Sequence, residues 1–205
     1  MNPQEFFETM YSKVDEGYLT LWTSPDKRTY WFPVGEWEEA ATVALELSRR
    51  RRDVYFGVGL RREILPDQKR GGTKDVLVLP GVWIDFDIKS EEAHKKDALP
   101  PDLDSAVDLV NSFPHPPSLM VHSGHGLHAY WLFKEPWVLE SPKEREVAQS
   151  FLRDFQAAFI HLALERGWEI DNTSDLARVL RVPGTLNYKG DPVEVRILSP
   201  KVSTG

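Results

Sequence analysis

The chain has 205 residues, of which 41% are hydrophobic and 28% charged, the balance of a soluble globular protein with one domain or two tightly joined lobes. It contains no cysteine, so disulfides, thiolate zinc sites and cysteine nucleophiles are excluded. The formal net charge of −7 argues against a surface coated in cations for bulk nucleic-acid binding, although it leaves room for a local basic groove.

The sequence gives no sign of a membrane protein. The N-terminus has no basic region followed by an apolar stretch, and no apolar run approaches the roughly 20 residues of a membrane span. We therefore expect a cytoplasmic protein without a membrane partner. Cations cluster at 49–52, at 61–62 and near the end of the chain. The four arginines at 49–52 are typical of a solvated helix C-terminus, and a phosphate-tracking patch is the alternative.

The predicted elements, in chain order, mix hairpins with helices. Helical spacing of apolar residues covers 3–14, 36–50, about 103–113 and 143–167. Strand patterns cover 18–24 and 28–34 as a hairpin, then 53–60, 76–88, 118–123, 127–133 and 193–198. The stretch "DLARVLR" at 175–181 predicts a further short helix. Because strands and helices do not alternate regularly, the pattern favours an α+β fold over a doubly wound parallel sheet.

Two acidic residues alternate near the end of the predicted strand 76–88, in "VWIDFDIK". Asp85 and Asp87 project to the same side of a strand, about 7 Å apart. Two such carboxylates repel each other unless a cation lies between them, and oxygen ligands suit Mg²⁺ or Mn²⁺ in nucleotidyl transfer. A solvent-facing pair at a strand end is the alternative, and this motif alone does not decide between them.

Three histidines follow at a spacing of three in "MVHSGHGLHAYW", at His122, His125 and His128. A zinc site would have to gather them from two strands and a glycine turn, which is not favoured. The "SGHG" stretch is instead typical of a tight turn whose N–H groups and Ser123 hydroxyl approach a phosphate. His128 can then donate a hydrogen bond to a polyphosphate. Ordinary surface histidines on a hairpin are the alternative for His122 and His125.

A further acidic candidate lies in "WEIDNTSDLARVLRVPGTLNYKG", residues 168–190. Asp171 follows an apolar-ended segment and is able to complete a three-carboxylate metal site. Asp175 competes with it, although a carboxylate in the first turn of the predicted helix also explains Asp175.

Cations and an amide follow these aspartates closely. Arg178 and Arg181 are expected near one face of the short helix, and Asn187 and Lys189 are two residues apart on the extended stretch after it. A buried structural arginine pair is the alternative. It does not explain why three cations and an amide cluster beside a candidate metal ligand.

Together, "IDFDIK", "SGHGLHAYW" and "EID" followed by "LARVLRVPGTLNYK" resemble the three motifs of archaeo-eukaryotic primases, and most closely the primase-polymerase branch of plasmids, phages and bacterial mobile or CRISPR-linked loci. The resemblance covers about residues 53–198. It implies an α+β primase core with an RRM-like sheet joined to an N-terminal α/β part, and one catalytic domain over 1–205. It also implies a nucleotidyltransferase that makes primers or extends DNA on single-stranded templates, using NTPs or dNTPs and two divalent metal ions.

The resemblance assigns roles to the matching residues. The catalytic metal carboxylates, for two Mg²⁺ or Mn²⁺ ions, are expected to be Asp85, Asp87 and Asp171. The incoming nucleotide is expected to be bound by Ser123, His128, Arg178, Arg181, Asn187 and Lys189.

The chain departs from many relatives in two ways. Many carry a cysteine-based zinc element near the active site, and this chain has no cysteine, so any template contact of that element must be made otherwise. Relatives are also often followed by a helicase or a helical priming domain, whereas this chain ends at Gly205 soon after its last predicted strand. One interpretation is an excised N-terminal core of a longer protein, for which polymerisation is better supported than primer initiation.

Two other functions compete with this one. A histidine-metal endonuclease that nicks single-stranded DNA would pair histidines with a tyrosine nucleophile, but its histidines are usually separated by one residue. A non-catalytic single-strand binding module would use Tyr130 and Trp131 as stacking platforms. That function leaves three spaced aspartates unexplained.

Overall fold

The structure, a computed structural model of the chain, describes residues 1–90 and 98–198. Its helices are α1 (Pro3–Met10), α2 (Trp37–Arg49), α3 (Leu103–Asn111) and α4 (Pro142–Glu165), with a 3-10 turn η1 at Thr73–Asp75. Its strands are β1 (Tyr18–Ser24), β2 (Thr29–Pro33), β3 (Asp53–Gly57), β4 (Leu60–Arg61), β5 (Val76–Asp87), β6 (Leu119–His122), β7 (Gly126–Val138), β8 (Val179–Arg181), β9 (Leu186–Asn187), β10 (Val193–Glu194) and β11 (Arg196–Leu198). The four longer predicted helices and the predicted strands are confirmed, with 53–60 and 193–198 each divided into two short strands.

The helix starts are explained by local sequence. Asn2 and Ser141 each accept a hydrogen bond from the third residue of the helix that follows, and Glu5 and Glu144 bond back to them, so both α1 and α4 begin with a capping box. A proline follows each cap, where its missing N–H costs nothing. These signals fix where α1 and α4 begin.

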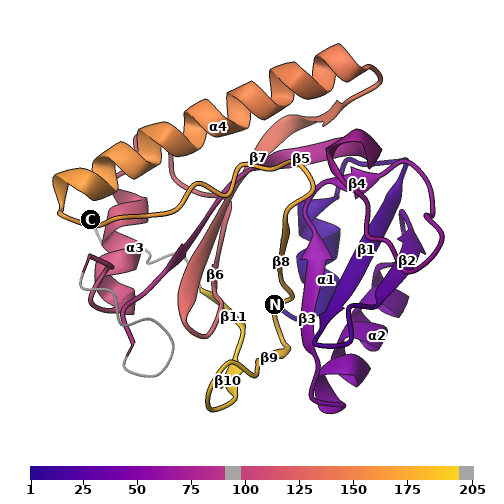
Figure 1. Cartoon of the computed structure of the whole chain (residues 1–205), viewed down its shortest axis with the longest axis horizontal. Helices are drawn as coiled ribbons and strands as arrows, with labels where there is room; N and C mark the ends of the chain where they lie inside the picture. The colour runs from indigo at the N-terminus through magenta and orange to yellow at the C-terminus, as the bar shows by residue number, and fades with distance from the viewer. Residues whose placement is uncertain (91–97, 199–205) are drawn as a thin grey trace.

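One large antiparallel sheet runs through the molecule. Its strand order is β11-β6-β7-β5-β4-β1-β3-β8, with β2 paired to β1, and each pairing of these strands is antiparallel. The predicted α+β fold is confirmed. The C-terminal part of the chain supplies both end strands, β8 and β11, so the segment between them runs from one end of the sheet to the other, in the lower part of Figure 1.

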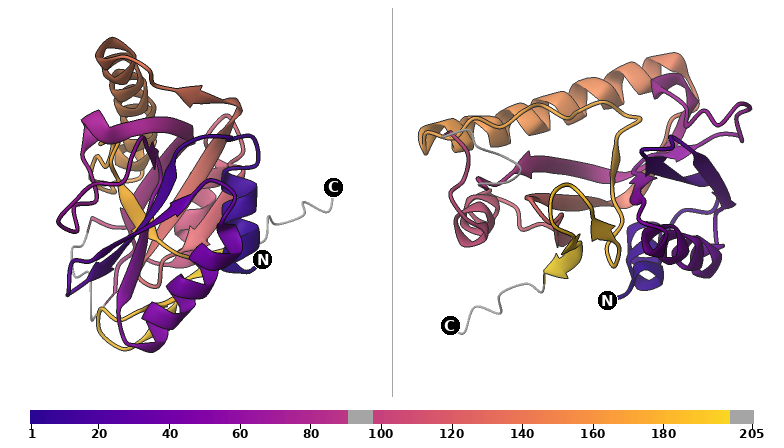
Figure 2. Two further views of the ribbon diagram at one scale, coloured as in Figure 1. Left: turned by 90° about the vertical axis from the view of Figure 1, so that its right-hand side faces the viewer. Right: turned by 60° about the horizontal axis from the view of Figure 1, so that its bottom comes forward.

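Helices cover the sheet in two groups. The long α4 lies along β5 and α3 packs on β7, while α1 and α2 pack together over the N-terminal strands (Figures 1 and 2). At the junction, Phe6 of α1 contacts Phe56 of β3 and Tyr130 of β7, with ring centroids 5.3 and 5.9 Å apart. One hydrophobic core therefore joins the N-terminal part to the central strands.

The short helix predicted at 175–181 is wrong. A turn at 176–177 is followed by β8, which pairs with β3 at Leu180 and Arg181. The free edge of β3 needs a hydrogen-bonding partner, and this long-range pairing overrides the local helical spacing of the segment. Arg178 and Arg181 consequently do not share a helix face, and Asp175 is not in a first helical turn.

Two further expectations concern the surface. The arginine run begins at the end of α2, where Arg49, Arg50 and Arg51 are exposed, as a solvated helix end requires. Arg51 also lies over the Tyr188 ring, 5.1 Å from its centroid. In the part of the chain that the structure describes, no helix has the length and apolar character to cross a membrane.

Candidate active site

The central strands β5 and β7 carry the first elements of the site. Their register sets Asp85 opposite His128 and Asp87 opposite Gly126, so these positions share one face of the sheet. His128 Nε2 lies 3.3 Å from Asp85 Oδ1. Glycine is required at 126, because a Cβ there would approach the Phe86 carbonyl oxygen to 2.5 Å. Backbone crowding thus keeps the surface beside Asp87 free of a side chain.

The "SGHG" stretch forms the predicted tight turn between β6 and β7. Ser123 N–H donates to the Gly126 carbonyl at 2.9 Å, and Gly124 adopts a φ of +99°, which favours glycine. The buried Asn187 side chain donates to the Ser123 carbonyl at 2.7 Å and accepts from Lys189 N–H at 2.9 Å. Asn187 therefore fastens the turn to the segment that carries Lys189.

Arg178 reaches Asp85 from the segment before β8. Its Nη2 donates to Asp85 Oδ2 at 3.0 Å, and its Nη1 lies 3.5 Å from Asp175. The Arg178 Nε atom is buried and makes no hydrogen bond to any described residue. Arg178 is thus a cation positioned between two carboxylates.

Buried polar groups hold the segment that leads to Arg178. The Thr173 carbonyl accepts from Trp83 Nε1 at 3.2 Å, and Thr173 N–H donates to Gln156 Oε1 of α4 at 2.7 Å. Further along, Arg61 Nη2 donates to the Ala177 carbonyl at 3.1 Å. Both anchors are buried, so they fix the backbone that presents Arg178.

Asp85 is kept in its ionised form. Burial would raise the pKa of this carboxyl, but the hydrogen bond from His128 and the charges of His128 and Arg178 outweigh it and lower the pKa to about 2. The side chain is 21% exposed, so it remains accessible to a ligand. A carboxylate must be ionised and partly exposed to bind a metal ion or to accept a proton, and Asp85 meets both conditions.

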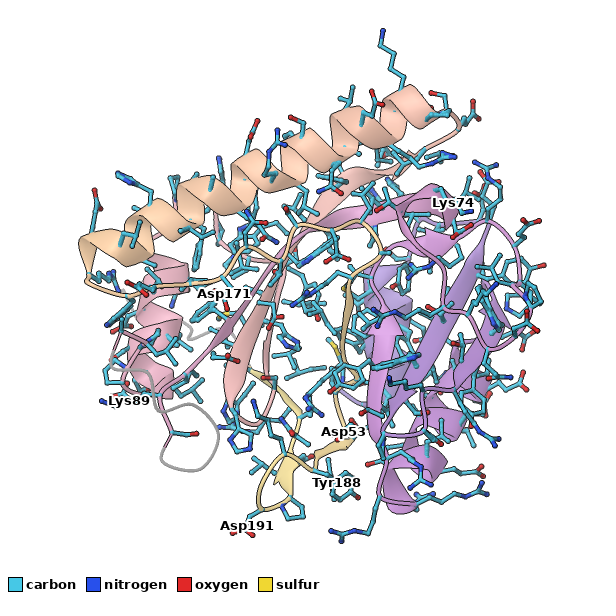
Figure 3. The ribbon with its side chains drawn as sticks, viewed as in Figure 1. Asp53, Lys74, Lys89, Asp171, Tyr188 and Asp191 are labelled. Atoms are coloured by element: carbon cyan, nitrogen blue, oxygen red, sulfur yellow. The ribbon has the colours of Figure 1, made fainter. Side chains whose placement is uncertain are left out.

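A second ion pair lies across the site. Arg181 Nη1 donates to Asp53 Oδ1, the same oxygen that accepts from Tyr188 N–H at 2.9 Å. The Arg181 guanidinium also lies over the Tyr55 ring, 4.8 Å from its centroid. In Figure 3, Asp53 of β3 lies close to Tyr188, the residue that follows β9.

These groups surround a pocket of about 180 Å³, which we call the site pocket. It is lined by Tyr55, Asp85, Asp87, Ser123, His125, His128, Arg178, Val179, Leu180, Arg181, Asn187 and Lys189. All the residues predicted for the site line it except Asp171. Asp171 is exposed, does not line the pocket and lies apart from Asp53 and Tyr188 in Figure 3. Asp175 does not line the pocket either, and contacts it only through Arg178.

The three histidines make contacts with different residues. His128 contacts Asp85, His125 donates through Nε2 to the Lys189 carbonyl at 2.6 Å, and His122 pairs with Arg196 of β11 across the strands. Within residues 1–90 and 98–198, no three histidine, aspartate or glutamate side chains gather closely enough to hold a metal ion. The three histidines therefore do not gather as a zinc site, and the predicted carboxylates Asp85, Asp87 and Asp171 do not gather as a group of three either.

Asp53, Tyr55 and the contact of His125 were not predicted from the sequence. Asp53 and Tyr55 alternate on β3 and therefore share a face, which the pattern "DVYFG" contains. Nothing local links that face to Arg181, which is 128 residues further along the chain. Only the pairing of β8 with β3 brings them together.

No protein-family model and no curated protein matches the sequence, whereas solved structures match the fold. The primase-polymerase (PrimPol) AEP domain of cyanophage S-2L superposes with a TM-score of 0.59 at 15% identity, covering 96% of this chain and 88% of that one. The chain has an archaeo-eukaryotic primase fold. The resemblance predicted from the three motifs is confirmed for the fold.

Two structures of the primase RepB′ show the same primase fold. One superposes with a TM-score of 0.51 at 11% identity and covers 98% of this chain but 57% of that chain. The other is the RepB′ catalytic domain in complex with initiator DNA, with a TM-score of 0.51 at 13% identity, covering 98% of this chain and 86% of that one. At these identities the likeness concerns the fold alone.

Proposed function

We propose that this chain is a template-dependent nucleotidyltransferase that extends or initiates a strand on single-stranded DNA. The observation that carries the proposal is the site pocket of a primase fold, in which the ionised Asp85 lies beside His128 and Arg178. A pocket with carboxylates on one wall and arginines on another suits a metal-bound triphosphate.

The carboxylates fit a divalent cation. Asp85 and Asp87 share one face of β5, and the low pKa of Asp85, about 2, keeps it charged at neutral pH. Mg²⁺ is commonly held by one or two carboxylates together with water and substrate phosphates. Asp85 and Asp87 would therefore hold Mg²⁺ or Mn²⁺, which when bound lowers the pKa of an attacking hydroxyl and neutralises the triphosphate. Asp171 as a third ligand, with Asp175 as its competitor, stays a prediction.

The remaining pocket residues would bind the nucleotide. Arg178, Arg181 and Lys189 supply positive charge for the triphosphate, while His128 and Ser123 supply hydrogen-bond donors. In the transfer, the 3′-hydroxyl oxygen of the growing strand would bond to the α-phosphorus of the nucleotide. The bond from that phosphorus to the bridging oxygen would break, and pyrophosphate would leave with the electron pair. The hydroxyl proton would pass to solvent.

The test is nucleotide incorporation by wild type and by Asp87→Asn. The protein is incubated with Mg²⁺ or Mn²⁺, labelled NTPs or dNTPs and single-stranded DNA, with and without an annealed primer. Asp87 is exposed, so the variant should fold normally but lose about a hundredfold or more of its incorporation rate. Asp154→Asn removes a 74% exposed carboxylate from α4 and serves as the matched control, with wild-type activity expected.

The products decide between the functions. Products without a primer indicate a primase, and products only with a primer indicate strand extension. Near-normal incorporation by Asp87→Asn would remove Asp87 from the chemistry. Template cleavage with a covalent tyrosine adduct would indicate a nicking endonuclease, and DNA binding without any metal-dependent product would indicate a binding module.

A further inference from the structure

A row of two aromatic side chains, with an arginine at each end, crosses the N-terminal strands. Trp22, Tyr55 and Arg181 are direct cross-strand neighbours on β1, β3 and β8. The Trp22 and Tyr55 rings are 5.5 Å apart, and Arg181 lies 4.8 Å from the centre of the Tyr55 ring. Arg70 lies over the other end, 4.8 Å from the centre of the Trp22 ring. We call Arg70, Trp22, Tyr55 and Arg181 the arginine–aromatic row.

The row lies on the face of the sheet away from α1. Phe56, the neighbour of Tyr55 on β3, packs against Phe6 and Phe7 of α1, and adjacent strand residues point to opposite faces. All four side chains of the row keep part of their surface exposed, and the core residues beneath them are buried. Part of each side chain in the row is therefore open to a ligand.

One end of the row enters the site pocket. Tyr55 and Arg181 line that pocket together with Asp85 and Asp87. A polymer lying along the row would therefore lead directly to the proposed site of nucleotide transfer.

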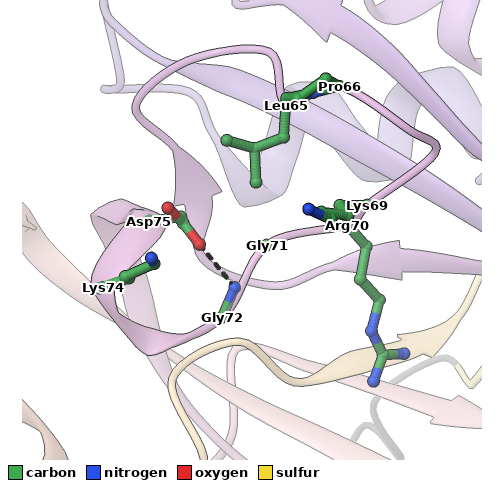
Figure 4. A pocket seen from close by; sticks show the side chains of 8 residues that line it. All are labelled: Leu65, Pro66, Lys69, Arg70, Gly71, Gly72, Lys74 and Asp75. Carbon is green, nitrogen blue, oxygen red and sulfur yellow. Dashed lines mark hydrogen bonds between the residues drawn. The ribbon is translucent and has the colours of Figure 1, made fainter.

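Arg70, at the other end of the row, belongs to a basic loop, residues 65–75. Arg70 lines a second pocket of about 430 Å³, shown in Figure 4, which we call the loop pocket. The residues around it are Leu65, Pro66, Lys69, Arg70, Gly71, Gly72, Lys74 and Asp75. Its lining carries three cations and one carboxylate, in a chain whose net charge is −7. That carboxylate, on Asp75, already accepts from Gly72 N–H at 2.8 Å.

The loop is tied to the sheet. The Gln68 carbonyl accepts from Thr29 Oγ1 at 2.7 Å, and Thr29 N–H donates to the Gln68 side chain at 3.0 Å. Thr29 is the cross-strand partner of Trp22 in β2. The Arg70 carbonyl also accepts from the buried Arg61 at 2.9 Å. The basic loop and the row therefore form one fixed surface.

We propose that the arginine–aromatic row and the loop pocket bind the single-stranded template and direct it into the site pocket. This rests on the function proposed above and names the surface that would hold its template. Bases stack on the flat guanidinium of Arg70, which the Trp22 ring supports from its other side, and backbone phosphates lie against Lys69 and Lys74. Stacking on aromatic rings tolerates every base, and a basic surface attracts the phosphates, which is what a template of arbitrary sequence requires.

The test is binding of a fluorescein-labelled 20-residue oligothymidine, followed by anisotropy without nucleotide or metal. Trp22→Ala should lower the affinity roughly tenfold through lost stacking, and Trp22→Phe should restore most of it. Arg70→Ala should lower the affinity through the lost stacking of its guanidinium. A Lys69→Ala and Lys74→Ala double variant should weaken binding and reduce the salt slope of log K by about 0.7 for each lost phosphate contact.

Two matched controls lie elsewhere. Trp137→Ala removes an indole from the aromatic cluster that β7 forms with Phe151 of α4, and Arg153→Ala removes an exposed cation from α4. Both should bind the oligonucleotide like wild type. Thermal melting accompanies each variant, and if Trp22→Ala does not fold, Arg70→Ala and the lysine double variant decide.

The outcomes separate this proposal from the proposed function. Wild-type affinity in Trp22→Ala, Arg70→Ala and the lysine double variant overturns the template surface, and so does an equal loss in Trp137→Ala. Incorporation by the wild type, lost in Asp87→Asn, supports the proposed function in either case. If the wild type incorporates nothing but the row variants lose oligonucleotide affinity, the surface stands and the proposed function fails.

Discussion

At the scale of single residues, the arginine at 61 is the most buried charge in the described chain. Arg61 is 0% exposed, and its guanidinium donates to the carbonyls of Gly59, Arg70 and Ala177. Burial lowers the pKa of Arg61 to about 10, so the group stays charged at neutral pH. The planar guanidinium of Arg61 thus joins the basic loop to the backbone that precedes Arg178.

Arg61→Lys should lower the free energy of unfolding by about 2 to 4 kcal/mol, because a lysine cannot reach three carbonyls at once and leaves buried acceptors unsatisfied. Urea unfolding measures the loss. Arg62→Lys, at the exposed neighbouring position, should change the free energy by less than about 0.5 kcal/mol. Equal effects of the two substitutions would contradict this role of Arg61.

His122 gives the protein a pH dependence of stability. Burial, with smaller effects from Arg196, His125 and His128, lowers the pKa of His122 to about 4. Because its pKa in the unfolded chain is about 6.5, the unfolded state takes up the proton first as the pH falls. The stabilisation by neutral His122 is therefore present above about pH 6.5 and is lost between about pH 6.5 and pH 4.

Because the His122 ring is partly exposed, the effect of its pKa shift on stability is smaller than the shift alone would give. The free energy of unfolding that is lost through His122 on acidification should be about 1 to 2 kcal/mol. Urea unfolding of wild type and His122→Leu at several pH values between 7.5 and 4 isolates it, since other groups titrate alike in both proteins. Parallel pH curves for the two proteins would rule out His122 as the source.

The residue patterns explain which site members were predictable. Asp85 and Asp87 alternate on β5, and His128 follows the tight turn that joins β6 to β7, so alternation and turn chemistry identify both motifs from nearby sequence. Only the pairing of β5 with β7 sets Asp85 opposite His128. Asp53 and Tyr55 join the site only through a strand that arrives much later in the chain. No local signal carries that information.

At the scale of elements, the β5–β7 pair holds the carboxylates, and backbone contact sets its geometry. Gly81 of β5 lies against Trp131 and Leu132 of β7, so closely that a Cβ at this position would collide with the Trp131 carbonyl oxygen. The register of the two strands also shifts beside Gly81. The absence of a side chain is therefore what lets the strands meet.

Gly81→Ala should lower the free energy of unfolding by about 2 to 3 kcal/mol, since backbone on both strands must move to admit a methyl group. Gly72→Ala is the control, because a Cβ at that position would meet nothing within 4 Å. Chemical denaturation of both variants measures the difference. A loss in Gly81→Ala no greater than that in Gly72→Ala would show that the strands have room to part.

The segment 175–181, which was predicted to be a helix, shows that local sequence pattern does not always decide the secondary structure. The "DLARVLR" stretch has helical spacing, yet Leu180 and Arg181 form a strand. The hydrogen bonds from Val58 N–H to the Arg178 carbonyl and from Val182 N–H to the Val54 carbonyl extend the pairing at both ends. The edge of β3, which lies 122 to 126 residues earlier in the chain, decided the conformation, and helix propensity is too weak to compete with it.

At the scale of the whole molecule, the sheet is continuous from the N-terminal strands to the central pair. Phe6 of α1 packs between Phe56 of β3 and Tyr130 of β7, and the late strand β8 completes the N-terminal edge. The N-terminal part thus depends on residues from the end of the described chain. These connections favour one folding unit over two independent lobes.

Urea unfolding should therefore show a single transition, with the same midpoint by far-UV circular dichroism and by tryptophan fluorescence. Phe6→Ala should lower the free energy of unfolding by about 3 to 5 kcal/mol and shift both midpoints together, because the cavity opens where the N-terminal and central strands meet. Phe151→Ala on α4, where the ring is 48% exposed, should cost less than about 1.5 kcal/mol. Two separated transitions, with Phe6→Ala moving only one of them, would mean that the N-terminal part folds as a lobe of its own.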